Sequence, residues 1–355
     1  MVSGVKVEPI LRILDANANR AREGIRTAED YLRFTIGDAQ WAGRLRRVRH
    51  RISETLAACL SGPALIEARR VLTDSGHPAR GAAEAPAPRN EEPRQVALRG
   101  LKRAQEALRV LEEYLQGPAP AGARQLAEAR YELYEAEQWL VCGGESARRL
   151  VTAFLYVLLC EAQCRLGLEA TARAALKGGA DMIQLREKQL EGAALVERAR
   201  RLREVCGEYG ALLIVNDRAD VALAAQAAGV HLGQADLSPA DVRRWSGAGL
   251  LIGRSTHSLQ EARRAVEEEE AAYLAVGAMY ATATREQAVV VGPELARQVL
   301  AQGWQVPAFA IGGITPERAR ELRRYGVRRV AVSSAVAAAP DPERAAREFC
   351  EVLKA

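Results

Sequence analysis

The pattern of apolar and polar residues changes character near residue 145 of the chain. Before this point, apolar residues recur with helical spacing almost throughout, which predicts a mainly α-helical segment. After it, short apolar runs rich in strand-forming residues alternate with longer stretches of helical pattern. A chain of 355 residues is long enough for about two domains. We therefore expect one domain over residues 1–145 and a second over residues 146–355.

Eight strand-like runs follow the change in pattern. They cover residues 154–159, 181–186, 212–216, 229–233, 250–254, 272–277, 307–311 and 329–333. Eight βα units in this length predict a (β/α)8 barrel, or TIM barrel, so the fold class is α/β with a separate, mainly α-helical N-terminal domain. A doubly wound sheet is the alternative. It is less favoured, because no predicted strand is followed by a dinucleotide fingerprint.

An internal repeat marks the predicted helical domain. Residues 18–32 (ANRAREGIRTAEDYL) and 101–115 (LKRAQEALRVLEEYL) share Arg, Ala, Glu, Tyr and Leu at a constant offset. Steps of three residues place each arginine beside a glutamate on a helix. The repeat indicates either two similar salt-bridged helices packed antiparallel, or a pseudo-twofold domain with a charged site between its halves. Residues 80–94 lie between the repeats, and their Pro- and Ala-rich composition predicts a mobile loop.

Composition excludes several classes of protein. A hydrophobic fraction of 48% and a net charge of only +5 rule out a disordered chain. Charges of both signs interleave, so we expect no nucleic-acid partner. No apolar run reaches the roughly 18 residues of a membrane span, and the first residues lack a signal core, so we expect a cytoplasmic protein without membrane association. The six cysteines lack metal-site spacing, which predicts free thiols.

Candidate chemistry gathers where the predicted strands end. In a barrel of this type, the C-terminal ends of the strands carry the active site. Asp217 and Asp236 follow neighbouring strands and can share Mg²⁺. Arg186, Lys188 and Arg285 can neutralise a diphosphate, and Lys188 stands out because only five lysines occur among the 50 basic residues. Gly313, Ser333 and Ser334 fit a phosphate cradle after strands seven and eight.

Each of these residues also has a simpler interpretation when it is taken alone. Asp217 can pair with Arg218, the adjacent Gly312 and Gly313 are common in turns, and His231 is typical of a structural core histidine. Their joint occurrence at one rim favours a pocket for small phosphorylated substrates.

Seven segments of the second domain carry a specific resemblance. QLREK, VNDRADVAL, GVHLGQADL, IGRSTHS, TAT, AIGGIT and VAVSSAV, in this order, resemble the thiamine-phosphate synthase family over residues 155–353. The resemblance implies joining hydroxymethylpyrimidine diphosphate to hydroxyethylthiazole phosphate, with release of pyrophosphate. Departure of the diphosphate leaves a pyrimidine-stabilised carbocation that the thiazole nitrogen attacks, so no protein nucleophile is required.

The resemblance also implies roles for individual residues. Those of the pyrimidine diphosphate site are Gln184, Leu185, Arg186, Glu187, Lys188 and Asn216, with Ser255 on the leaving diphosphate and Asp217 and Asp236 on Mg²⁺. Those of the thiazole phosphate site and its loop are Thr282, Ala283, Thr284, Arg285, Gly313, Ser333 and Ser334. Lys188, Ser255 and Arg285 are the catalytic candidates. Arg285 stands where the family usually has lysine, and the first strand runs into Leu159, Cys160 and Glu161 where the family usually has Thr-Asp.

The thiazole tautomerases are the alternative for the barrel. They share the barrel and the GRSxHS segment, and their catalytic histidine matches His257. Their metal-binding carboxylates are usually missing. The presence of Asp217, Asp236 and Lys188 therefore favours a synthase.

The N-terminal domain resembles the hydroxymethylpyrimidine-phosphate kinase-like module that is often fused to this synthase. The segments that carry the resemblance begin at Asp15 (DANANRAREGIR) and at Leu101 (LKRAQEALRVLEEY). It implies ATP-dependent formation of the synthase's substrate. The candidate residues are Asn17, Asn19, Arg20, Arg22, Glu23, Arg26, Glu29, Asp30, Arg103, Glu106 and Arg109, with Asp74 as a metal ligand. No P-loop or protein-kinase glycine-rich loop occurs, so a non-catalytic module for dimerisation or substrate handover stays open. We also expect a homo-oligomer.

Overall fold

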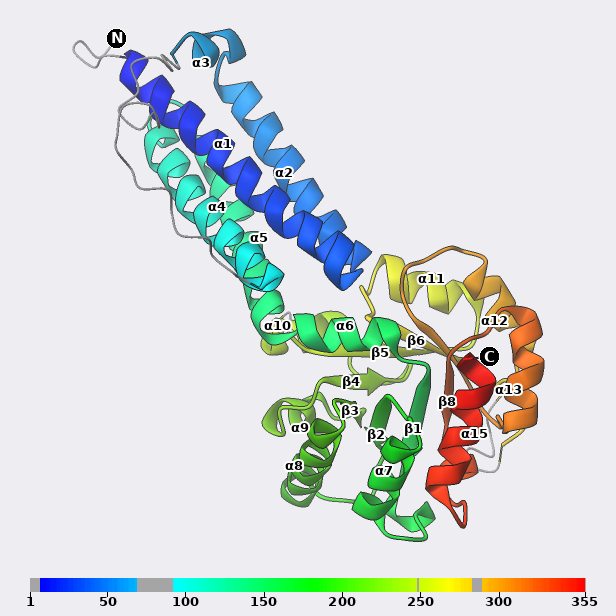
Figure 1. Ribbon diagram of the computed structural model, residues 1–355. Helices are drawn as coiled ribbons and strands as arrows, with labels where there is room; N and C mark the ends of the chain where they lie inside the picture. Colours follow the sequence, from blue (N-terminus) through cyan, green and yellow to red (C-terminus); the bar gives the residue numbers. More distant parts are fainter. Residues whose placement is uncertain (1–6, 69–91, 248, 283–288, 355) are drawn as a thin grey trace. The chain divides into compact units, whose positions relative to one another are not determined.

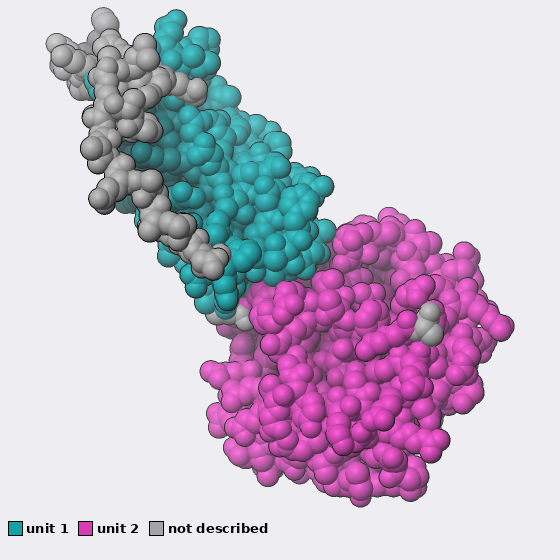
Figure 2. All heavy atoms as spheres, in the orientation of Figure 1, with its two compact units in different colours: residues 1–141 teal, residues 142–355 magenta. Residues whose placement is uncertain are grey.

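The computed structural model describes residues 7–68, 92–247, 249–282 and 289–354. The chain divides into two compact units, Met1–Val141 and Cys142–Ala355, which Figure 2 colours separately. The boundary predicted at residue 145 lies inside helix α6 (Gly144–Thr152), which belongs to the second unit. Most of the expected loop at residues 80–94, and the candidate ligand Asp74, lie outside the described residues.

The second unit contains the predicted parallel barrel of eight strands. The strands are β1 (Leu155–Leu159), β2 (Met182–Leu185), β3 (Leu212–Asn216), β4 (Gly229–Leu232), β5 (Leu251–Thr256), β6 (Tyr273–Gly277), β7 (Ala308–Ile311) and β8 (Val330–Val332). Each strand pairs with the next, and β8 pairs with β1 to close the sheet (Figure 1). The α/β fold class and the (β/α)8 architecture are therefore confirmed.

The two faces of each strand have different environments. Alternate residues such as Val157, Ile183 and Val215 join the apolar core between the strands and the surrounding helices. The residues between them, including Tyr156 and Gln184, turn toward the inside of the barrel and are also buried. This double burial explains why the strands read as nearly continuous apolar runs.

Helices cover the outside of the barrel. They are α6, α7 (Leu168–Lys177), α8 (Gly192–Glu208), α9 (Ala219–Ala224), α10 (Pro239–Ser246), α11 (Leu259–Glu267), α12 (Pro293–Leu300), α13 (Pro316–Leu322), α14 (Ser334–Ala337) and α15 (Pro342–Lys354), with 3-10 turns η4 (Glu161–Gln163) and η5 (Arg323–Tyr325). Ser238, Ser258 and Thr315 cap α10, α11 and α13 by accepting a hydrogen bond from a backbone N–H of the first turn. These caps fix where each helix leaves the strand before it.

The first unit consists of helices. They are α1 (Val7–Tyr31), the π-helical turn η1 (Leu32–Ile36), α2 (Ala39–Cys59), α3 (Gly62–Ala68), α4 (Pro93–Leu115) and α5 (Pro120–Cys142). The repeated segments lie in α1 and α4, which pack side by side (Figure 1). A Cβ atom added to Gly24 would lie 2.3 Å from the carbonyl oxygen of Gly100, so glycine is required where the two backbones meet.

The contacts at this crossing give the direction of the two helices. Gly24 faces Ala104, whereas Thr27, one turn further along α1, faces Gly100, one turn earlier on α4. The repeated helices therefore run antiparallel.

Two expectations from composition can be compared with the structure. In the part of the chain that the structure describes, no helix is both long and apolar enough to cross a membrane. Cys59, Cys160, Cys164, Cys206 and Cys350 are free thiols, as predicted for them.

Candidate active site

A cavity of about 910 Å³ opens at the C-terminal ends of the barrel strands. Residues from several strand ends and following loops line it, which is why residues far apart in the sequence meet there. Of the residues proposed from sequence, the cavity brings together Gln184, Arg186, Lys188, Asn216, Asp217, Asp236, Ser255, Thr282, Gly313, Ser333 and Ser334.

Two further candidates of the barrel, Leu185 and Glu187, lie away from the cavity. The side chain of Leu185 is buried in the core between strands and helices. The carboxylate of Glu187 accepts the backbone N–H of Glu161 and pairs with Arg198 at 3.3 Å. Neither residue lines the cavity. Ala283, Thr284 and Arg285 lie outside the described residues.

Asp217 and Asp236 form a pair of interacting carboxyl groups. Asp217 has a left-handed backbone, with φ of 60°, and its N–H donates to the carbonyl of His231 at 2.9 Å. Burial, together with the hydrogen bond and the charge of Asp236, raises the pKa of Asp217 to about 6. The pair is therefore costly to ionise fully without a nearby positive charge.

This pair of carboxyl groups fits a divalent cation. Mg²⁺ takes carboxylate oxygens together with substrate phosphate oxygens, so a site with two carboxylates and an open side is suitable for it. Within the described residues, no cluster of three or more acidic, His or Cys side chains supplies a fuller ligand set. Substrate phosphate oxygens and water are suitable further ligands.

Two cationic side chains lie beside the acidic pair. The positive charges of Lys188 and Arg186 act on Asp217 and lower its pKa, against the larger effects of burial and Asp236. Neither cation forms an ion pair with another residue in the described part of the chain. Both remain available to an anionic ligand in the cavity.

Arg254 holds the turn that carries Asp236, a role that the sequence did not reveal. Its guanidinium is almost fully buried, pairs with Glu269 at 2.7 Å and donates to the carbonyl of Gly233. The N–H of Gly233 in turn donates to the carboxylate of Asp236 at 2.7 Å. The buried ion pair therefore supports the position of one carboxylate in the pair.

The opposite part of the rim contains a backbone cradle. Gly312 and Gly313 have φ of 101° and 63°, and a Cβ atom on Gly313 would lie 2.4 Å from the carbonyl oxygen of Ala281. The hydroxyl of Ser333 reaches the carbonyl of Leu158 at 3.0 Å, and Ser334 begins helix α14. Only glycine fits at position 313, and this leaves the backbone open toward the cavity.

Arg318 adds a cation to this part of the rim. Its guanidinium lies 4.6 Å from the centre of the Tyr280 ring and donates to the carbonyl of Gly313. It lines the cavity from the first turn of helix α13, three residues after the Thr315 cap. The pattern of polar residues at strand ends does not point to it, because it lies inside a helix.

A buried polar cluster forms the floor of the cavity. Nε2 of His231 lies 2.9 Å from Oγ of Ser255, and Nδ1 lies 3.2 Å from the hydroxyl of Tyr273. The Tyr273 hydroxyl lies 3.0 Å from that of Tyr156, to which the amide of Gln184 donates. His231 thus links two predicted substrate residues, although its sequence context indicated only a core role.

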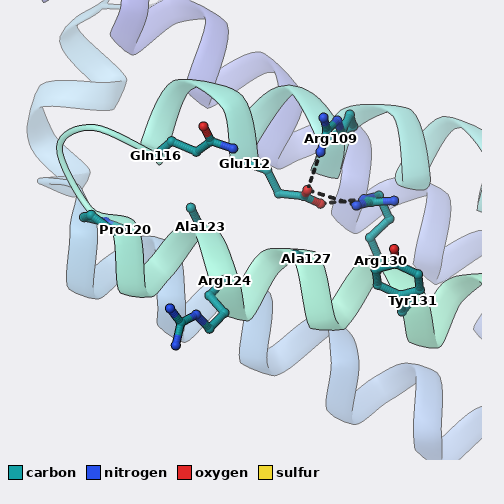
Figure 3. Close-up of a pocket in the computed structure, with 9 residues that line it drawn as sticks. All are labelled: Arg109, Glu112, Gln116, Pro120, Ala123, Arg124, Ala127, Arg130 and Tyr131. Atoms are coloured by element: carbon teal, nitrogen blue, oxygen red, sulfur yellow. Dashed lines mark hydrogen bonds and ion pairs between the residues drawn. The ribbon is translucent and has the colours of Figure 1, made fainter.

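The helical unit has its own charged pocket, between α4 and α5 (Figure 3). It has a volume of about 390 Å³. Buried Glu112 accepts two hydrogen bonds from Arg130, one of them at 3.0 Å, and one from Arg109 at 3.2 Å. In the other half of the repeat, buried Glu29 pairs with Arg46 and Arg49 of α2. These arginines neutralise carboxylates inside the protein.

The candidates of the helical unit are spread over α1 and α4. The amide of Asn17 donates to the carbonyl of Ile13, and Arg22 donates to Asn19, which approaches Asp15. Arg26 pairs with Asp30 at 3.0 Å. Four further candidates are exposed, namely Arg20, Glu23, Arg103 and Glu106. Among the predicted residues that the structure describes, Arg109 alone lines the pocket in Figure 3.

Comparison with known proteins gives the same division of the chain. Residues 155–336 match the thiamine monophosphate synthase family, and residues 12–139 match the ThiD2 family. A thiamine-phosphate synthase of Gloeobacter violaceus is 39% identical over 350 residues, which cover 98% of each chain. One from Synechocystis is 38% identical over 344 residues and covers 97% of this chain and 96% of that protein.

A solved structure agrees with the barrel. The thiamine phosphate pyrophosphorylase from Pyrococcus furiosus is 36% identical, with a TM-score of 0.53, over 58% of this chain and 97% of that chain. The full-length relatives share both units and carry the synthase name, which agrees with the synthase interpretation and not with the tautomerase one. With its rim of paired carboxylates, cations and a backbone cradle, the chain belongs to the thiamine-phosphate synthase family.

Proposed function

We propose that the barrel joins hydroxymethylpyrimidine diphosphate to hydroxyethylthiazole phosphate in a Mg²⁺-dependent reaction. The bond between the pyrimidine methylene carbon and the diphosphate oxygen breaks, and a bond from that carbon to the thiazole nitrogen forms. The products are thiamine phosphate and pyrophosphate. The observation that carries this proposal is the placement of the Asp217–Asp236 pair beside Arg186 and Lys188 at one rim.

The acidic pair and the two cations suit the diphosphate end of the pyrimidine substrate. Asp217 and Asp236 would hold Mg²⁺, which when bound supplies positive charge to the diphosphate oxygens. Arg186 and Lys188 add fixed positive charge where the leaving group gains negative charge. Asn216 and Ser255 line the same region and would orient the substrate.

The glycine cradle suits the phosphate of the thiazole substrate. Backbone N–H groups near Gly313 and at the start of α14 would bind its oxygens, together with Ser333, Ser334 and Arg318. Thr282 lines the cavity close by, and Thr284 and Arg285 belong to the same loop in the sequence. Holding two substrates at opposite parts of one cavity brings the reacting carbon and nitrogen together.

We further infer that the helical unit makes the pyrimidine diphosphate from the monophosphate and ATP. The match of residues 12–139 to the ThiD2 family supports this, as does the full-length similarity to fused relatives. The polar side chains Asp15, Asn19 and Arg22 lie together on α1 and are the first candidates for its site. The competing proposal is a module that promotes dimerisation or hands over substrate without chemistry.

One assay of the full-length protein tests both proposals. Pyrimidine monophosphate, thiazole phosphate and Mg²⁺ should give thiamine phosphate only when ATP is added, whereas pyrimidine diphosphate should give it without ATP. Product from the diphosphate alone, with none from monophosphate and ATP, would leave the non-catalytic role for the helical unit. Conversion of a thiazole tautomer without any coupling would contradict the synthase proposal.

A further inference from the structure

A line of polar side chains crosses the inside of the barrel beneath the cavity. It runs from Gln184 on β2 through Tyr156 on β1, Tyr273 on β6 and His231 on β4 to Ser255 on β5. The first four side chains are buried. Bulk water therefore does not compete for their hydrogen bonds, and each group must find its partner within the line or in a ligand.

The orientation of the Gln184 amide sets the direction of the whole line. Its Nε2 donates to the hydroxyl of Tyr156, whose single proton is then free to donate to Tyr273. The proton of Tyr273 in turn points to Nδ1 of His231. A hydroxyl carries only one proton, so each donor in the series determines the next one.

The protonation states of the central groups keep this direction. The imidazole of His231 is buried and both of its nitrogens face hydroxyl groups, an environment that suits the neutral ring. Burial raises the pKa of both tyrosines, so they stay protonated donors. Since Nδ1 accepts from Tyr273, the single ring proton lies on Nε2 and donates to Oγ of Ser255. The Ser255 proton is then available to the cavity.

The other end of the line has the opposite polarity. Oε1 of Gln184 is buried and has no hydrogen-bond partner among the described residues. An unsatisfied buried acceptor is costly, and a donor on a bound ligand would remove that cost. The exocyclic amino group of the pyrimidine is a donor of this kind, whereas phosphate oxygens can only accept.

We propose that Tyr156, Tyr273 and His231 are positioning residues that form a one-way hydrogen-bond relay. The relay keeps Gln184 an acceptor toward the pyrimidine ring and Ser255 a donor toward the diphosphate. It therefore favours one orientation of the substrate, with the pyrimidine ring at Gln184 and the diphosphate at Ser255. This inference rests on the synthase function proposed above, but the state of the relay can be measured without turnover.

The reversed relay would be a poor match to the same substrate. With the Gln184 amide turned over, every hydrogen bond changes direction, and Nε2 of His231 becomes the acceptor of the Ser255 proton. Ser255 would then present lone pairs to acceptor-only diphosphate oxygens, and Gln184 would present N–H groups to an amino group. The tautomer of His231 thus reports which direction the protein uses.

The first experiment observes the imidazole nitrogens of His231 by ¹⁵N NMR in the full-length protein. The chain has four histidines, and the spectrum of a His231→Gln variant assigns the His231 signals. We expect a proton on Nε2 and none on Nδ1 at pH 7, with and without added inorganic pyrophosphate. A proton on Nδ1, or an even mixture of tautomers, would overturn the relay even if the enzyme makes thiamine phosphate.

Two hydroxyl deletions then separate the two ends of the relay. Tyr273→Phe removes the donor to Nδ1, so we expect a mixed His231 tautomer and a fall in kcat of about 10-fold to 100-fold. Tyr156→Phe leaves the hydroxyl of Tyr273 beside His231 but frees the Gln184 amide. We expect a mixed His231 tautomer here too, because no donor then directs the Tyr273 proton, and a rise in KM for the pyrimidine diphosphate of about 10-fold.

Phe309 supplies the matched control. Its ring packs against Tyr156 and Tyr273, with centroids 5.6 and 5.8 Å apart, but it has no hydroxyl. Phe309→Leu should lower the melting temperature without changing the tautomer of His231. If the two tyrosine variants and this control have the same effect on KM, kcat and tautomer, the residues only pack the barrel. If the wild type makes no thiamine phosphate yet shows the Nε2 proton, the proposed function fails and the relay stands.

Discussion

Asp217 shows most directly how a single residue trades stability for chemistry. Its left-handed backbone and its nearness to Asp236 hold a carboxylate where the fold disfavours negative charge. A carboxyl whose pKa is raised by folding stabilises the protein at low pH, and this contribution is lost as the pH rises through about 6. The cost at neutral pH is what a bound cation would relieve.

Asp217→Asn should therefore have opposite effects on stability and activity. Asparagine tolerates the left-handed backbone and carries no charge. Without Mg²⁺, we expect a higher melting temperature than wild type at pH 7.5 and no difference near pH 4. Added Mg²⁺ should stabilise the wild type but not the variant, and formation of thiamine phosphate should fall at least about 100-fold. A variant that is less stable than wild type at pH 7.5 without Mg²⁺ would contradict this account.

Lys188 should affect the pH dependence of the same site. Its charge lowers the pKa of Asp217, so Lys188→Ala should raise that pKa further. We expect the acid limb of kcat/KM, measured at saturating Mg²⁺, to move to higher pH, and kcat/KM at pH 7.5 to fall about 100-fold. Lys177→Ala is the control, because Lys177 pairs with Glu343, away from the cavity. An unchanged acid limb would show that Lys188 does not act on Asp217.

At the scale of elements, the glycine loop after β7 depends on backbone shape. Gly313→Ala adds a methyl group 2.4 Å from the carbonyl oxygen of Ala281 and should displace the cradle. We expect KM for the thiazole phosphate to rise at least about 10-fold, with little change in KM for the pyrimidine diphosphate. Gly303→Ala is a matched control, since Gly303 also has a positive φ of 69° but nothing within 4 Å of its added Cβ. An equal effect of both variants on the KM for the thiazole phosphate would exclude the cradle as its phosphate-binding site.

The stability of the helical unit depends instead on buried ion pairs. Glu112 is almost fully buried against Arg130, so Glu112→Gln should lower the free energy of unfolding of the helical unit by about 3 kcal/mol. Glu113 is half exposed and pairs with Arg109, so Glu113→Gln should cost less than about 1 kcal/mol. Urea unfolding followed by circular dichroism measures both. Equal changes in the free energy of unfolding would mean that burial of the Glu112 ion pair does not add to stability.

At the scale of the whole molecule, the two compact units should carry separable activities. Full-length Asp217→Asn should lose formation of thiamine phosphate and still convert pyrimidine monophosphate and ATP to the diphosphate. Full-length Asn19→Ala, which removes the partner of Arg22, should show the reverse. Product analysis by phosphorus NMR distinguishes these outcomes. Loss of both activities in either variant would argue for a single shared site.

The local pattern of apolar and polar residues was sufficient to predict the strands and most of the cavity residues at their C-terminal ends. The eight strands follow from apolar runs between helical stretches, and most cavity residues follow from the rule that barrel strands end at the active site. Leu185 and Glu187 show where this reasoning fails. Successive residues at a strand end face opposite sides, so a continuous motif includes side chains that turn away from the cavity.

The amino-acid sequence alone determined the strands, the internal repeat and the chemical character of the residues at the strand ends, because these depend on residue type and short-range periodicity. Only the tertiary structure decided which distant side chains meet. His231 contacts Tyr273, Tyr273 contacts Tyr156, and Arg254 supports the turn of Asp236, because closure of the barrel places β1, β4 and β6 around one interior. No local pattern encodes these pairs, since each side chain is held by partners from other strands and loops.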